Sequence, residues 1–310
     1  MVFIGSCAAK MHALHARTGE ILWQYDIRQD GEQNSFHGKF LLSDSLLLAG
    51  TDTPTGHLYA FHQKTGAVLW KQKVSGSGAP TDILRSGDKI YTVIDDDVLI
   101  CLRLQTGEPV WQFKSEFDGE IHALLTRSAA LRGNRIFFGG HAGKVHALEK
   151  DTGEQIWATD VGARISTTIV ANDSSLFFGT ADGQIFRLWQ KSGEIDTKLH
   201  SGQVAIGRPT LTNNALFVLL SEGGLMGQGY GWQLMAIDLS LQKQLWQLEP
   251  GSKWTATKTY LHNGVLLTGN EFGEVTAIDP KTGKDVWYTT VDGTVRSIGT
   301  QGNWLYVGTI

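Results

Sequence analysis

Short runs of alternating apolar and polar residues recur along the whole chain, and tight turns separate them. The clearest succession is Ile165–Val170, Ser175–Thr180 and Gln184–Trp189, with Asn172-Asp173 and Ala181-Asp182-Gly183 between the runs. Alternation with a period of two predicts β-strands, and Asp-Gly between two such runs predicts a hairpin. No stretch keeps the 3.6-residue period of an amphipathic helix, so the pattern indicates an all-β protein.

One phrase repeats in step with these strands. Its fullest form reads Ala-Ile-Asp-Pro-Lys-Thr-Gly-Lys-Asp-Val-Trp at Ala277–Trp287, and six looser copies precede it. They run over Ala13–Trp23, Ala60–Trp70, Cys101–Trp111, Ala147–Trp157, Arg187–Thr197 and Ala236–Trp246.

The period of this phrase predicts the architecture. The glycine stands at 19, 66, 107, 153, 193 and 283, with Gln242 in its place in the sixth copy, so the steps are 40 to 49 residues. About 40–45 residues with four strands per unit is typical of a propeller blade. We therefore predict a single domain over residues 1–310: a seven-bladed β-propeller of four-stranded antiparallel blades. The chain begins and ends inside a unit, which predicts that the N- and C-termini share one blade.

Each residue type in the phrase suits a structural role. The Ala is expected at a tight, buried place on the third strand, and Thr-Gly closes a turn in which Gly accepts a left-handed conformation. The Trp opens the fourth strand and can bury its ring between adjacent blades. The fifth copy has Arg187 in place of Ala and Thr197 in place of Trp, which predicts a less well packed junction beside it.

Composition excludes several classes of protein. The net charge of −4 gives no basic surface for nucleic acid, and no apolar run is long enough to span a bilayer. No signal peptide is visible at Met1–Ser6, which fits a cytoplasmic protein or a processed or truncated periplasmic form. Cys7 and Cys101 are too few for a disulfide framework or a closed zinc site, and Cys101 is expected to fill a buried, Ala-sized position.

The phrase Ala-x-Asp-x-x-Thr-Gly-x-x-x-Trp resembles the repeat of the PQQ-like, or quinoprotein alcohol dehydrogenase-like, β-propeller superfamily, including BamB-like repeats. The resemblance covers essentially the whole chain. That superfamily includes quinoprotein alcohol dehydrogenases, an outer-membrane assembly lipoprotein, and propellers joined to larger signalling or acyl-activating proteins. It therefore implies the fold and leaves several functions open.

The resemblance to quinoprotein dehydrogenases implies an adjacent cysteine pair and a calcium ion beside PQQ. The chain has no adjacent cysteines, and its acidic cluster Asp95-Asp96-Asp97 falls at a hairpin turn. We therefore expect no cofactor and no catalytic or metal-ligating residues, with PQQ and calcium kept as the alternative.

Two candidate binding sites remain. First-strand residues line the channel of a propeller, so Lys39, Arg208, Lys258 and Arg296 are interpreted as an anion-binding set, with Asp82, Thr168 and Ser297 at comparable places. The other site is the Gly-rich insertion 221–232, whose apolar residues are typical of interface cores: Leu225, Met226, Tyr230 and Trp232.

The leading hypothesis is a non-catalytic scaffold propeller that binds a protein or peptide through one face, as a monomer or as part of a larger protein. The alternative is a PQQ- or small-ligand-binding oxidoreductase that uses the mouth of the channel.

Overall fold

The computed structural model describes residues 1–6, 8–31, 35–36, 40–51, 56–74, 82–94, 98–116, 129–221, 232–248 and 259–309. The chain divides into two compact units. Unit 1 holds residues 1–122, 127–142 and 147–156, and unit 2 holds residues 123–126, 143–146 and 157–310. The prediction of a single domain over 1–310 stays a prediction.

Unit 1 carries blades 1 to 4, apart from the few residues of blade 4 that fall in unit 2. Blade 1 is three-stranded and blades 2 to 4 are four-stranded. Their strands are β1 (Val2–Gly5), β2 (Lys10–Leu14) and β3 (Ile21–Asp26); β4 (Leu41–Ser43), β5 (Leu46–Gly50), β6 (His57–His62) and β7 (Val68–Lys73); β8 (Ile83–Ser86), β9 (Lys89–Ile94), β10 (Val98–Arg103) and β11 (Pro109–Lys114); β12 (Ala130–Arg132), β13 (Arg135–Gly139), β14 (Lys144–Glu149) and β15 (Gln155–Asp160).

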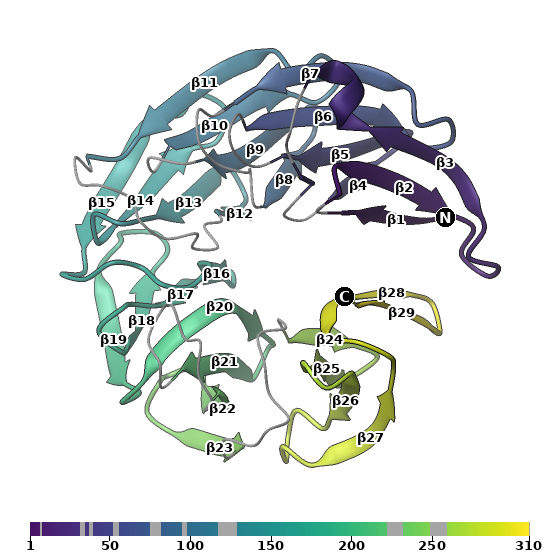
Figure 1. The fold of residues 1–310 in the computed structure, drawn as a ribbon. Helices are drawn as coiled ribbons and strands as arrows, with labels where there is room; N and C mark the ends of the chain where they lie inside the picture. Colours follow the sequence, from purple (N-terminus) through teal and green to yellow (C-terminus); the bar gives the residue numbers. More distant parts are fainter. Residues whose placement is uncertain are drawn as a thin grey trace. The chain divides into compact units, whose positions relative to one another are not determined.

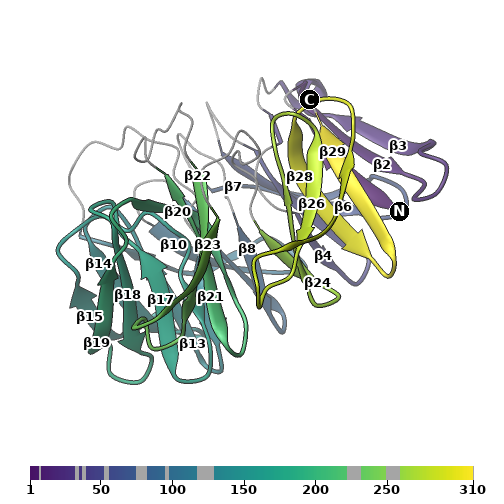
Figure 2. The ribbon, with the colours of Figure 1, turned by 90° about the horizontal axis from the view of Figure 1, so that it is seen from below.

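Unit 2 carries blades 5 to 7 and a terminal hairpin. Its strands are β16 (Val170–Ala171), β17 (Ser175–Gly179), β18 (Gln184–Trp189) and β19 (Ile195–His200); β20 (Val204–Leu211), β21 (Ala215–Ser221), β22 (Trp232–Asp238) and β23 (Gln244–Leu248); β24 (Tyr260–His262), β25 (Val265–Gly269), β26 (Glu274–Ile278) and β27 (Asp285–Thr290); β28 (Val295–Gln301) and β29 (Trp304–Thr309). Figure 2 shows β28 and β29 lying side by side as a hairpin.

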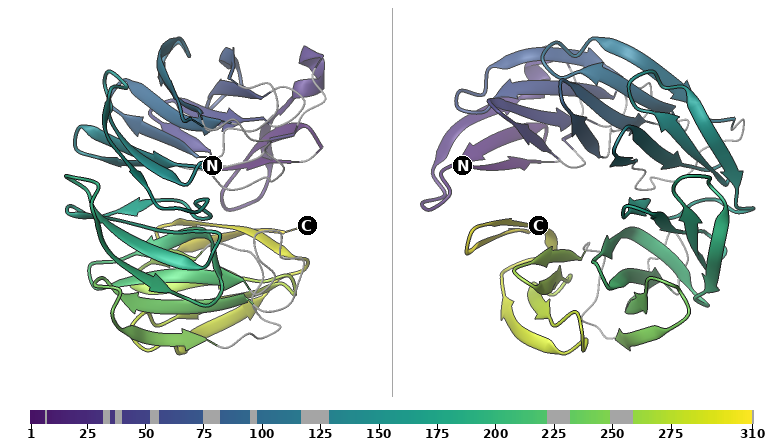
Figure 3. Two further views of the ribbon diagram at one scale, coloured as in Figure 1. Left: turned by 90° about the vertical axis from the view of Figure 1, so that its left-hand side faces the viewer. Right: turned by 180° about the vertical axis from the view of Figure 1, so that it is seen from behind.

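The fold class is confirmed: the chain is an all-β, seven-bladed β-propeller of antiparallel blades. In every sheet the strands lie in chain order, as Figures 1 and 3 show from opposite sides. The described residues contain no α-helix, only the 3₁₀ turn η1 (Ile27–Asp30). The N-terminal strands form a three-stranded sheet and the C-terminal strands a two-stranded one, so a blade shared by the termini stays a prediction.

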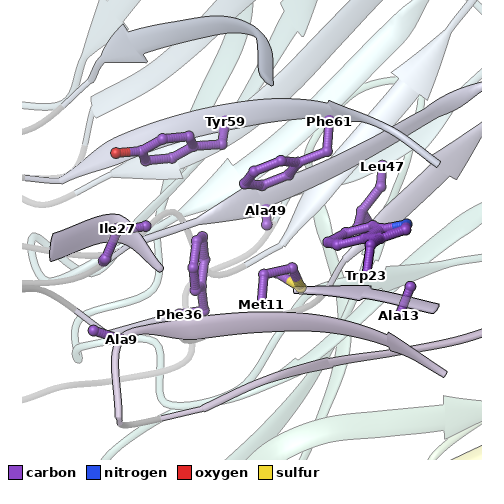
Figure 4. Packing of buried hydrophobic residues seen from close by; sticks show 10 residues of the cluster. All are labelled: Ala9, Met11, Ala13, Trp23, Ile27, Phe36, Leu47, Ala49, Tyr59 and Phe61. Atoms are coloured by element: carbon purple, nitrogen blue, oxygen red, sulfur yellow. The ribbon is translucent and has the colours of Figure 1, made fainter. Parts of the chain in front are cut away.

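The hydrophobic core lies between consecutive blades. At the junction of blades 1 and 2, Met11 and Trp23 of blade 1 pack against Leu47, Tyr59 and Phe61 of blade 2 (Figure 4). The rings of Tyr59 and Phe61 are stacked, with centroids 5.5 Å apart. Each blade therefore buries its apolar face only when a neighbouring blade covers it.

Most copies of the repeated phrase have the structural roles predicted for it, but Trp287 of the last copy is 40% exposed and is not buried between blades. The Ala position is fully buried in six copies, including Cys101, which is a free thiol. The Ala and Trp positions lie directly opposite one another on the third and fourth strands, as Ala60 does with Trp70 and Ala236 with Trp246. In blade 5 the same pair is Arg187 and Thr197. A small residue on one strand thus makes room for a large one on the other.

The Trp side chains fasten consecutive blades. At five junctions the indole Nε1 donates to a backbone carbonyl of the next blade, with distances of 2.7 to 3.3 Å: Trp23 to Gln63, Trp70 to Leu104, Trp111 to Lys150, Trp157 to Gln190 and Trp246 to Pro280. At each of these junctions the ring also lies against the glycine of the next phrase, where a Cβ atom would stand 2.5 to 2.8 Å away. These glycines have positive φ and no room for a side chain, so both turn geometry and packing select Gly.

Candidate functional site

The structure describes three of the predicted site residues. Arg208 is half-buried on β20, Arg296 is exposed on β28, and Trp232 is the first residue of β22. Five predicted site residues lie outside the described residues: Lys39, Lys258, Leu225, Met226 and Tyr230.

Trp232 has a structural environment that the sequence did not indicate. It pairs with Ser221 across the β21–β22 ladder and packs, partly buried, against the apolar cluster between blades 6 and 7. The strand thus begins at the residue that was expected to end the loop. Its role in partner binding stays a prediction.

The first strands of blades 5 and 6 carry the same irregularity. In blade 5, four residues (166–169) lie between the positions paired with Thr180 and Phe177, whereas the second strand has two (178–179). In blade 6, residues 207–209 stand opposite residue 218 alone. Bulges of this kind interrupt the ladder and turn side chains to new directions.

Arg208 lies inside the bulge of β20. Gly207, just before it, has a φ of +68° and so takes a conformation that Gly adopts without strain. Arg296 lies at a smaller register shift in β28, between the positions paired with Thr309 and Gly308. The register of the strands thus sets both arginines apart from the regular hydrogen-bonded ladder.

Hydroxyl groups satisfy the backbone that the bulge of blade 5 releases. The Gly179 amide donates to Thr167 Oγ1 at 2.8 Å, and Ser166 Oγ donates to the Ala205 carbonyl at 2.6 Å. The Thr168 amide donates to the Gly207 carbonyl at 2.9 Å, beside a parallel bridge between Thr167 and Gly207. The bulged segments of blades 5 and 6 therefore lie side by side, and they bring Thr168 next to Arg208.

A hydroxyl pair continues this polar band toward blade 7. Thr210 Oγ1 lies 2.7 Å from Thr259 Oγ1 and 2.9 Å from the Thr259 carbonyl oxygen. We call the residues Ser166, Thr167, Thr168, Gly207, Arg208, Thr210 and Thr259 the inner polar band of unit 2. Its hydroxyls are mostly bonded within the fold, and Ser166, Thr167 and Thr168 are no more than 4% exposed, whereas the half-buried guanidinium of Arg208 is suited to a carboxylate.

A calcium ion would need a cluster of acidic or other ligating side chains. Nowhere among them do three His, Cys, Asp or Glu side chains come close enough together to hold a metal ion. The acidic run 95–97 lies outside the described residues. Of the histidines, His15 and His62 act in turns, where Nδ1 lies 2.9 Å and 3.1 Å from the hydroxyl oxygens of Thr18 and Thr65. The equivalent positions of His15 and His62 in the repeat, rather than ligand binding, explain why these two histidines are present.

One charged cluster was missed by the sequence analysis. Asp30, at the end of η1, accepts hydrogen bonds from the hydroxyls of Tyr25 (2.8 Å) and Tyr59 (2.8 Å), while Lys71 Nζ lies 3.9 Å away. Burial, together with the hydrogen bond to Asp30, raises the pKa of Tyr25 to about 12. The cluster joins blades 1 and 2. Asp30 stands in the spacer between two phrases, where the repeat gives no signal.

No helix suited to crossing a membrane by its length and hydropathy occurs in the part of the chain that the structure describes.

The inner bulges, the fastening tryptophans and the four-stranded blades define a β-propeller of PQQ-like repeats. The chain belongs to the family described as "Outer membrane protein assembly factor BamB", whose model matches residues 8–144, 95–240 and 233–309.

Two groups of curated proteins resemble the chain. The outer membrane protein assembly factor BamB of Yersinia pestis is 23% identical over 94% of this chain and 75% of its own length. The BamB of Burkholderia pseudomallei is 22% identical over 51% of this chain, but the match spans only 40% of that protein. The quinoprotein alcohol dehydrogenase PedH of Pseudomonas putida is 33% identical over 26% of this chain and 15% of its own length. The chain thus spans less than half the length of some curated relatives.

Solved structures share the fold. BamB from Moraxella catarrhalis superimposes with a TM-score of 0.76 at 20% identity, over 99% of this chain and 88% of that one. A europium-containing methanol dehydrogenase gives a TM-score of 0.70 at 14% identity, over 94% of this chain and 77% of that one. At such identities the likeness establishes the fold alone.

Proposed function

We propose that this chain is a non-catalytic scaffold propeller that binds an acidic segment of a protein partner through its inner strands. The observation that carries the proposal is Arg208 in the bulge of β20, beside the hydroxyls of the inner polar band. Bulges re-aim side chains at functional positions, and guanidinium groups bind carboxylates with two parallel hydrogen bonds. Arg296, which is exposed, adds a second cation in unit 2.

The relatives support protein binding as the general role. Several of them are named outer membrane protein assembly factors, and this name implies that they act on other proteins. We extend that role to this chain as part of the proposal, with the partner defined by its chemistry: an extended segment rich in Asp or Glu.

A fluorescence titration with an oligoglutamate peptide tests the proposal, and an oligolysine and a Gly-Ser peptide serve as comparisons. We expect only the acidic peptide to bind, with an affinity that falls as salt rises. The double variant Arg208→Glu, Arg296→Glu is expected to weaken binding by about tenfold or more.

The matched control is the double variant Lys64→Glu, Lys281→Glu, which changes the net charge equally at two exposed turns. Equal weakening by both double variants would mean that the peptide responds to net charge and would overturn the site. Equal binding of all three peptides would overturn the acidic partner.

The quinoprotein alternative is favoured by one observation, the 33% identity to PedH over 88 residues. Among the described residues, no three His, Cys, Asp or Glu side chains come together to hold a calcium ion. Adding PQQ and calcium to the pure protein and measuring absorbance and intact mass tests this alternative. A bound quinone that survives gel filtration would replace the scaffold role with a redox one.

A further inference from the structure

The junction between blades 5 and 6 lacks the indole that fastens the five junctions described above. In each of those, the acceptor is the carbonyl of the third residue after the Ala position of the next phrase, such as Lys150 after Ala147. By the same count, the acceptor in blade 6 is Leu239, three residues after Ala236. Blade 5 has Thr197 where the Trp donor would be.

Arg187 reaches that acceptor from a different strand. Its Nη1 donates to the Leu239 carbonyl at 3.2 Å. Arg187 stands on the third strand, directly opposite Thr197 on the fourth. The exchange of Ala and Trp for Arg and Thr therefore keeps one small and one large residue at this pair. It replaces a neutral donor with a charged one.

The guanidinium of Arg187 is held in place by its own blade. Its Nε donates to Ser175 Oγ at 3.2 Å and lies 3.3 Å from Asp196 Oδ2. The indole ring of Trp189 lies below it, with the guanidinium carbon 4.7 Å from the ring centroid. The side chains of Arg187 and Asp196 keep 19% and 25% of their exposure, so solvent ions can reach the pair.

Blade 6 supplies the apolar part of the contact. Leu241 is 3% exposed and belongs to the cluster that spans both blades, together with Phe177 and Ile185 of blade 5. It has a φ of +58°, a left-handed conformation that is strained for a side chain with Cβ. Gln242 follows where the other phrases have Gly. Because no indole lies over this turn, the glycine is not required for packing.

We propose that the junction of blades 5 and 6 is a salt-sensitive hinge of the propeller. The hydrogen bond that stands in for the indole's depends on a charged donor positioned by an ion pair, unlike the inner-strand bonds from Ser166 and Thr168, and the apolar contact includes a strained leucine. Both features favour opening here before the indole-fastened junctions. The released strain of Leu241 lowers the cost of opening, and screening of Arg187 and Asp196 lowers it further as ionic strength rises.

Hydrogen exchange read by mass spectrometry tests the hinge. We compare peptides covering residues 234–248 of blade 6 with peptides covering residues 98–107 of blade 3, where Trp70 fastens the junction. Between about 0.1 M and about 1 M NaCl, the Debye length falls from about 10 Å to about 3 Å. Exchange in blade 6 should rise about two- to fivefold, the effect of losing much of a partly exposed ion pair. Exchange in blade 3, where the indole of Trp70 holds the junction although the exposed Arg85–Asp44 pair also spans it, should change less than about twofold.

Substitutions identify the residue responsible. Arg187→Ala should raise exchange in blade 6 at low salt and remove its salt response, whereas Arg187→Lys keeps the charge and should keep the response. Arg85→Ala removes an exposed ion pair with Asp44 between blades 2 and 3, and should leave blade 6 unchanged. The variant Arg187→Ala, Thr197→Trp, Leu241→Thr, Gln242→Gly restores the common phrase and should protect blade 6 at all salt concentrations.

A salt response of equal size in blades 3 and 6 of the wild type would overturn the hinge, as would no response in either. If the fourfold variant does not fold, the comparison of Arg187→Ala with Arg187→Lys is enough to test the hinge. The same salt response in both would show that the charge at residue 187 is not the cause.

Discussion

The indole ring of Trp246 in blade 6 lies so close to Gly283 in blade 7 that a Cβ atom on the glycine would stand 2.8 Å from the ring. The same indole donates to the Pro280 carbonyl at 3.0 Å. One side chain thus supplies both the hydrogen bond and the close packing of the junction, and this makes the pair a direct test of how blades are fastened.

Gly283→Ala is expected to lower the free energy of unfolding by about 2–4 kcal/mol. The new Cβ overlaps the Trp246 ring, and the φ of +72° is strained for Ala. Urea denaturation followed by tryptophan fluorescence measures the change. Gly264→Ala is the matched control, since it has a φ of +80° but open space around the new Cβ. An equal loss in both variants would mean that backbone strain, and not the ring, sets the cost.

Trp111→Ala should cost about 3–5 kcal/mol, because it removes a large, mostly buried ring and leaves the Lys150 carbonyl without its donor. Phe272→Ala removes another aromatic ring, but that ring is 60% exposed, and its loss should change stability by no more than about 0.5 kcal/mol. Denaturant midpoints of the two variants provide the comparison. Similar small effects in both would show that the indole is dispensable at this junction.

The raised pKa of Tyr25 predicts that the protein loses stability at alkaline pH. Its folded pKa is raised to about 12, first by burial and then by the hydrogen bond to Asp30, against about 10 in the unfolded chain. A group with a raised folded pKa contributes stability that is present below the unfolded pKa and is lost as pH rises through the folded one. The wild type should therefore lose stability between about pH 10 and 12 more steeply than Tyr25→Phe. Identical slopes of melting temperature against pH would contradict this.

The lowered pKa of Asp279 predicts that the protein loses stability at acid pH. Hydrogen bonds from the Lys281 amide and the Thr282 hydroxyl lower the pKa of its carboxyl, so its contribution is present above the unfolded pKa near 3.9 and is lost as pH falls through the lower folded value. Asp279→Asn keeps an acceptor oxygen but does not titrate. The difference in melting temperature between wild type and variant should be largest near neutral pH. It should shrink toward zero as the pH falls below about 4. A difference that is constant with pH would exclude this carboxylate as the cause.

The repeated phrase was enough to predict the blades because its chemistry is local. Ala for a small space, Thr-Gly for a turn and Trp for the junction can each be read from a few neighbouring residues, and the structure confirms each role at Ala147, Gly153 and Trp157. The first-strand bulges could not be predicted, because they depend on the register between two strands. Of the site residues, the sequence placed Arg208 on an inner strand but gave no sign of the bulge around it.

The fifth copy shows where a signal was present but not used. The sequence predicted a less well packed junction from Arg187 in place of Ala and Thr197 in place of Trp. The structure shows Arg187 making the hydrogen bond of the missing indole and Leu241 filling the apolar space. Gln242 was the available signal: the glycine is absent from the one phrase that follows a copy without Trp. Two departures in consecutive repeats, considered together, would have predicted a compensated junction.

The division of each junction between a Trp in one repeat and a Gly in the next also limits how the chain can be rearranged. A duplicated repeat that carries both residues fits between any two blades fastened in the common way. Its Trp can bind the following blade, and its Gly can receive the Trp of the preceding blade. The junction of blades 5 and 6 is the exception, because the donor side of blade 5 and the acceptor turn of blade 6 match only each other, while Gly193 of blade 5 and Trp246 of blade 6 keep the common form. Gene duplication, circular permutation or designed insertion should therefore succeed at the Trp–Gly junctions. Between blades 5 and 6 such a change should fail, unless Arg187, Thr197, Leu241 and Gln242 are all kept in the rearranged chain.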